Sequence, residues 1–130
     1  MRAVLGSDAR LCASVARAFA VELMRSLRRR AKKLLGLGSV SEAHSGAVVA
    51  IQRTDSALRL NVHLHVLALD GVYVREPTGV LAFHALPLPS PEEIARIARR
   101  TAERLGRAFE AQGRPSPWQP PDASEPDPDP

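Results

Sequence analysis

LNVHLHVLAL, residues 60–69, is the stretch that decides the fold. Apolar residues occupy every even-numbered position, so in an extended strand they form one wholly apolar face. The odd-numbered face carries Asn61, His63 and His65 ahead of two leucines. We therefore expect a strand whose apolar side packs on a helix and whose other side presents both histidines.

The neighbouring segments supply further strands. Residues 47–52 form a short β-run before the histidines, and residues 80–85 form another after them. Asp70-Gly71 is a two-residue hairpin signal, which predicts that residues 72–74 return as the antiparallel neighbour of the histidine strand.

Two helices flank these strands. Residues 9–35 contain no Pro or Gly, and every fourth position along one face is apolar. These apolar residues are Leu11, Val15, Phe19, Leu23 and Leu27. We expect this helix to be capped by Asp8 or Ser7 and to end at Gly36.

The second helix is predicted from Pro91 to Gly113, because Ser90, Pro91 and Glu93 match a capping box with proline at the first helical position. Its arginines alternate with glutamates, which indicates a solvated face. The order helix, strands, helix predicts an α+β fold, in which a central antiparallel sheet has the long N-terminal helix and the C-terminal helix packed on one face.

The composition limits the organisation of the chain. Its 130 residues, 45% of them hydrophobic, suffice for one small domain, which we place at residues 1–113. Residues 114–130 are rich in Pro and Asp and are expected to be a disordered tail, in which Trp118 is the residue that could dock. No segment is apolar enough for a membrane span or a signal peptide, so we expect a cytoplasmic protein without membrane contact.

Charge points to a polyanionic partner. The tail holds one of the 18 basic and four of the 14 acidic residues, which leaves 17 against 10, a net charge of +7, on residues 1–113. Six of these positive charges lie close to the end of the first helix: Arg25, Arg28, Arg29, Arg30, Lys32 and Lys33. They are either contacts for nucleic-acid phosphates or a solvated helix end with a favourable dipole interaction.

His63-Leu64-His65 is the feature most suggestive of chemistry. Residues two apart in a strand point to the same side, roughly 6.5 to 7 Å apart, so two imidazoles can tilt onto one cation. Neutral imidazole suits Mn, Zn, Co or Ni. Cys12 is the sole cysteine, which excludes a cysteine cage. The other interpretation is that both histidines are ordinary sheet-surface residues with hydrogen-bonded neighbours.

A third ligand is left open by the sequence. Gln52 ends the preceding strand and His84 lies on a later one, but their faces depend on unknown hairpin registers. His44 falls in a loop, and nothing in its position favours it as a metal ligand. Tyr73 is the sole tyrosine, and we expect it to be a cross-strand packing residue instead of a nucleophile.

Two segments carry a resemblance to a known family. QRTDSALRLNVHLHVLALDGVYV (residues 52–74) and FHALPLPSPEEIARI (residues 83–97) resemble the middle of the paired-tyrosine transposases of rolling-circle insertion sequences. These belong to the His-hydrophobic-His (HUH) single-strand endonucleases, and the similarity covers most of residues 1–113. It implies that His63 and His65 bind a divalent metal (Mn, Mg or Zn) that polarises a phosphate of single-stranded DNA while a tyrosine attacks it.

Two parts of the family pattern are missing. A cysteine-rich zinc region ahead of this segment and paired tyrosines on a helix behind it have no counterpart here, and Tyr73 is not in the nucleophile position. The chain therefore resembles a transposase fragment that binds DNA and metal but is inactive in strand cleavage. The alternatives are a metal-independent nucleic-acid-binding protein and a protein-interaction module that self-associates through an exposed sheet edge.

Overall fold

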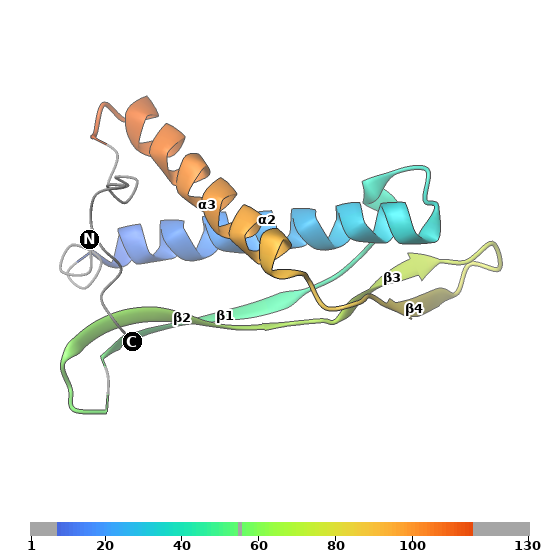
Figure 1. The fold of residues 1–130 in the computed structure, drawn as a ribbon, viewed down its shortest axis with the longest axis horizontal. Coiled ribbons are helices and arrows are strands. Elements are labelled where there is room, and N and C mark those ends of the chain that lie inside the picture. The colour runs from blue at the N-terminus through green and yellow to red at the C-terminus, as the bar shows by residue number, and fades with distance from the viewer. Residues whose placement is uncertain (1–7, 55, 116–130) are drawn as a thin grey trace.

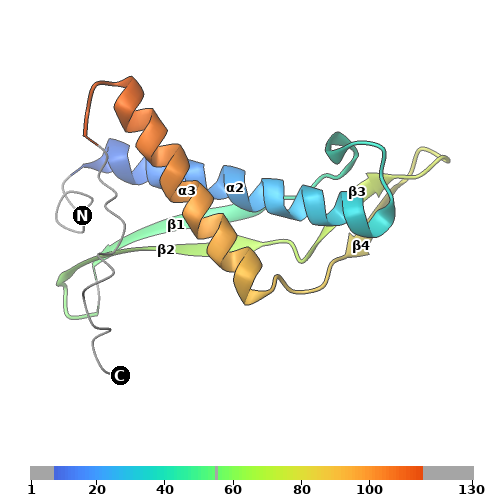
Figure 2. The same ribbon diagram turned by 45° about the horizontal axis from the view of Figure 1, so that its top comes forward.

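The computed structural model describes residues 8–54 and 56–115, so Trp118 and most of the predicted tail lie outside the described residues. The order of elements is α2 (Ala9–Leu35), the 3₁₀ turn η1 (Val40–Glu42), β1 (Ala47–Thr54), β2 (Leu60–Ala68), β3 (Gly71–Arg75), β4 (Leu81–Ala85) and α3 (Pro91–Ala111). Both helices lie on one side of the strands, as Figure 1 shows, and Figure 2 shows α3 crossing α2. The predicted α+β class is confirmed.

The strands are divided between two antiparallel sheets of two strands each, β1–β2 and β3–β4. The prediction that residues 72–74 pair with the histidine strand is wrong, because β3 pairs with β4 and β2 pairs with β1. Gly71 is not a hairpin residue. A Cβ atom there would lie 2.2 Å from the carbonyl oxygen of His84 and 2.9 Å from the Cα of Ala85, so close strand approach requires glycine.

The ends of α2 follow the predicted chemistry. The Asp8 side chain accepts hydrogen bonds from the backbone N–H groups of Arg10 and Leu11, and Gly36 closes the helix in the left-handed region at φ 65°. Along its length α2 contacts η1, β1, β3 and α3. No helix in the described part of the chain is long and apolar enough to cross a membrane.

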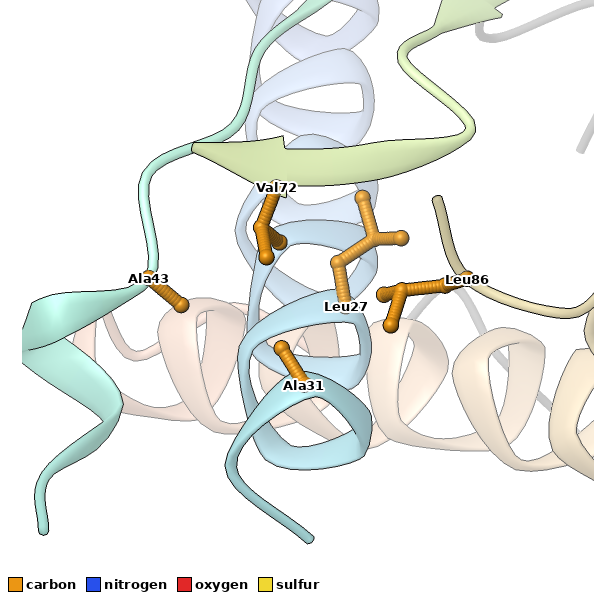
Figure 3. Close-up of a cluster of buried hydrophobic side chains, with 5 residues drawn as sticks. All are labelled: Leu27, Ala31, Ala43, Val72 and Leu86. Atoms are coloured by element: carbon orange, nitrogen blue, oxygen red, sulfur yellow. The ribbon is translucent and has the colours of Figure 1, made fainter. Parts of the chain in front are cut away.

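The main core lies under the second half of α2. Leu27 and Ala31 of α2 pack with Ala43, Val72 and Leu86, and all five are buried (Figure 3). Such burial contributes about 1.5–3 kcal/mol for each large aliphatic side chain. This cluster attaches the β3–β4 sheet to the helix.

A mixed polar and apolar layer joins α2 to α3. Glu22 of α2 is only 3% exposed, and its Oε1 accepts a hydrogen bond from Nε of Arg104 at 2.9 Å and forms a salt bridge with Nη2 at 2.8 Å. The prediction that the α3 arginines form a solvated face is thus wrong for Arg104. Ile97 and Leu105 of α3 are buried in the same contact region.

The start of α3 is capped by Ser90, whose hydroxyl accepts a hydrogen bond from the backbone N–H of Glu93. The Glu93 side chain does not serve the predicted capping box; its carboxylate contacts Ser26, Arg29 and Arg96 and so links α3 to α2. Hydrogen bonds from its own backbone N–H and from Ser90 lower the pKa of Glu92, which keeps this carboxylate ionised at the positive end of the helix.

Truncation of Leu27 to Ala is expected to destabilise the protein by about 2–5 kcal/mol, because the side chain is 6% exposed within the core. Leu67→Ala is the matched control, since Leu67 is 77% exposed, and should change stability by less than about 0.5 kcal/mol. Urea denaturation measures both. Equal effects of the two substitutions would contradict the position of the core.

Gly71→Ala is expected to cost about 1–3 kcal/mol, because the added methyl group would meet the backbone of β4. Gly46→Ala is the control, since a Cβ there meets nothing within 4 Å, and it should be neutral or slightly stabilising. Thermal unfolding of the two variants compares them. A Gly71→Ala protein as stable as the wild type would rule out the close contact between β3 and β4.

Candidate metal and nucleic-acid site

His63 and His65 lie side by side on β2. Their ring centroids are 4.8 Å apart and their planes meet at 67°. His63 is half-buried and His65 is exposed. The alternation of the strand thus places both imidazoles on one side, as the sequence predicts.

One hydrogen bond selects the tautomer of the neutral His63 ring. Its Nδ1 lies 2.8 Å from the backbone carbonyl oxygen of Asn61. Because a carbonyl oxygen only accepts, Nδ1 carries the proton and Nε2 of the neutral ring keeps its lone pair. Metal-binding histidines are commonly oriented in this way, by a hydrogen bond from the nitrogen that does not bind the metal.

Gln52 is brought to the histidine pair by the β1–β2 register, in which it lies opposite His63. Its Nε2 donates to the carbonyl of Thr54 at 2.9 Å, which turns Oε1 toward His65. Oε1 then lies 2.9 Å from His65 Nε2, which must donate in this arrangement. Of the two candidates for a third ligand, the structure therefore places Gln52 at the pair.

Imidazole nitrogens and amide oxygens are donor types that divalent cations accept. The 2.9 Å between Gln52 Oε1 and His65 Nε2 is a hydrogen bond, so His65 could bind a metal through Nε2 only after that nitrogen loses its proton. Among the described residues there is no group of three or more His, Cys, Asp or Glu side chains that could hold a metal. A site here would use two imidazoles and one amide oxygen, with remaining positions open to water or a phosphate.

The other sequence candidates lie elsewhere. His84 is on β4, in the second sheet, where its Nε2 is 3.6 Å from Glu76 Oε1. His44 forms a backbone bridge with Tyr73. The Tyr73 ring packs against Phe83 across the β3–β4 pair, with centroids 5.1 Å apart, so it has the expected packing role and is not on the strand next to the histidines.

The basic residues near the end of α2 differ in their surroundings. Arg25 pairs with Glu22 and Arg29 with Glu93, while Arg30 donates to the carbonyl of Pro87. Lys32 and Lys33 are exposed, and Arg28 is half-buried. Within the described part of the chain, Lys32 and Lys33 therefore have no ion-pair partner, whereas Arg25, Arg29 and Arg30 hold contacts within the fold.

The structure does not bring this basic segment and the histidine pair together. Cys12 and Val15, near the start of α2, border a small hollow with His63, Val62 and Leu64 of β2. Arg28 lies 13 residues beyond Val15, which corresponds to about 20 Å of helix. A ligand that contacts both places must therefore be elongated.

Sequence reasoning missed Glu22 and Glu93 as partners of the basic residues. Glu22 lies three residues after Phe19, and Ser26 lies four residues after Glu22, so all three share one helical face. Two polar residues thus continue a face that begins with apolar residues. That interruption is the available signal for a buried polar contact between helices.

Comparison of the chain with family models, curated proteins and solved structures finds no match.

Replacing both His63 and His65 by Ala is expected to abolish binding of Mn²⁺ or Zn²⁺ with little loss of stability, because neither ring is fully buried. Isothermal titration calorimetry measures the affinity, and circular dichroism checks the fold. His84→Ala serves as the control and should bind metal like the wild type. Equal metal affinity in the double variant and the wild type would exclude the histidine pair as the site.

Proposed function

We propose that this chain is an HUH-transposase-like domain that binds single-stranded DNA and a divalent metal but does not cleave the strand. The observation that supports this most is the convergence of His63, His65 and Gln52 on one side of a hairpin, with the Gln52 amide oxygen hydrogen-bonded to His65. All three residues belong to the segment on which the family resemblance rests, residues 52–74.

In this proposal, each residue has a defined task. His63 offers Nε2 because Asn61 holds the proton on Nδ1, and Gln52 is oriented by Thr54. Mn²⁺, Mg²⁺ or Zn²⁺ bound by the three side chains would supply positive charge to a phosphate oxygen of the DNA. The exposed Lys32 and Lys33 attract the rest of the polyanion.

The proposal that this chain does not cleave DNA rests on the position of Tyr73. It is the sole tyrosine of the sequence, and its ring packs on Phe83 in the β3–β4 sheet, whereas the histidines lie in the β1–β2 sheet. Strand transfer by a tyrosine requires the hydroxyl to reach the phosphate that the metal contacts. We therefore propose a binding role for this chain.

Binding of a fluorescein-labelled single-stranded oligonucleotide tests this function. We expect Mn²⁺ to strengthen binding and EDTA to remove that gain in the wild type and in His84→Ala. The double variant of His63 and His65 should show no gain. Salt-dependent binding that is indifferent to EDTA in all three proteins would instead favour the metal-independent alternative. A dimer in sedimentation that fails to bind DNA would favour the interaction module.

Incubation of the protein with labelled single-stranded DNA and Mn²⁺ is expected to yield no covalent adduct on a denaturing gel. Heat-denatured protein provides the background signal. A covalent adduct that disappears in Tyr73→Phe would contradict the assignment and would make Tyr73 a nucleophile.

A further inference from the structure

The contact between α2 and α3 carries more positive than negative charge. Four arginines pair with only two carboxylates: Arg25 and Arg104 with Glu22, and Arg29 and Arg96 with Glu93. The α3 arginines hold the shorter contacts, 2.8 Å for Arg104 and 3.1 Å for Arg96. The α2 arginines are 3.3 and 3.9 Å away, so their guanidinium groups have donors to spare.

Arg28 adds a fifth positive charge to this cluster. Its Nε is buried and has no hydrogen-bond partner among the described residues. A buried donor without a partner is costly, by roughly 1–3 kcal/mol, and Glu22 Oε2 is likewise buried without one, so the polar groups of this contact are incompletely paired among the described residues.

The three α2 arginines share one hollow. Arg25, Arg28 and Arg29 are spaced i, i+3 and i+4, so they occupy one face of the helix, and together with Val40 of η1 they line an open pocket. None of the described residues places a carboxylate in its lining. Guanidinium groups recognise oxyanions through pairs of parallel N–H donors, which makes phosphate the chemistry that suits this hollow.

We propose that this hollow is a phosphate site for a nucleic-acid strand and that it works without metal. A polymer is favoured over a single free phosphate because exposed Lys32, one turn beyond Arg28, extends the positive surface along the helix. The proposal deepens the DNA-binding part of the proposed function and rests on it, but it does not depend on the histidine pair.

The test is fluorescence anisotropy with a labelled single-stranded 20-nucleotide probe, in EDTA and over a series of salt concentrations. Arg28→Gln should weaken binding by about tenfold and reduce the slope of log K against log salt by about 0.7, the value for one phosphate contact on a single strand. Arg28→Lys should recover the slope but only part of the affinity, because it keeps the charge and loses the planar donors.

Arg107→Gln is the matched control, since Arg107 is exposed on α3 and the substitution changes the net charge equally. It should weaken binding by less than about twofold. The same loss in Arg107→Gln and Arg28→Gln would overturn the site, and so would an absence of oligonucleotide binding in EDTA. If the protein binds no oligonucleotide in EDTA but binds it with Mn²⁺, the arginine site is excluded and the histidine site is supported. The two proposals can therefore fail separately.

Two further measurements, competition by inorganic phosphate and binding to lipid vesicles, identify the source of the phosphate. Inorganic phosphate should displace the oligonucleotide from the wild type only at far higher concentration than an unlabelled strand. Equally effective competition would overturn the nucleic-acid assignment in favour of a free-phosphate site. Phosphatidylserine vesicles should bind no better to the wild type than to Arg28→Gln, and a clear Arg28-dependent preference for vesicles would assign the hollow to a membrane surface instead.

Discussion

Packing against α2 is the constraint on which the rest of this structure depends. A two-stranded sheet is marginally stable at best in water, and the strands here form two such sheets. Leu27 and Ala31 anchor the β3–β4 sheet through Val72, whereas the first turns of α2 border β2 at Val62 and Leu64. The histidine strand therefore keeps its orientation only while this helix is intact.

The second role of α2 is to carry polar groups into its contact with α3. Glu22 and Glu93 each bind arginines from both helices, which fixes the two helices relative to each other. Buried ion pairs add little net stability because desolvation opposes their attraction, but removing one partner leaves an uncompensated charge. The same arrangement leaves arginines of α2 with unused donors, so the packing of the helices and the proposed phosphate site have a common origin.

Much of the fold could be predicted from the sequence because local rules dominate there. The bounds of α2 follow from Asp8, Gly36 and an uninterrupted helical period, and the histidine strand follows from its alternation. The strand pairing could not be predicted, because Asp70-Gly71 matches a hairpin signal. The structure instead requires glycine at position 71 because β4 approaches its backbone closely. Gln52 remained one of two candidates because only the register of β1 against β2 sets its face.

Imidazole nitrogen NMR tests the central claim, a single site formed by His63, His65 and Gln52, most directly. In metal-free protein near pH 8, long-range ¹H–¹⁵N spectra should show the proton on Nδ1 of His63 and on Nε2 of His65. Added Zn²⁺ should shift the ring nitrogens of both histidines together, at one concentration, with loss of the Nε2 proton of His65, and leave His84 unchanged. Two rings that exchange freely between tautomers, or that respond to Zn²⁺ independently, would contradict the account.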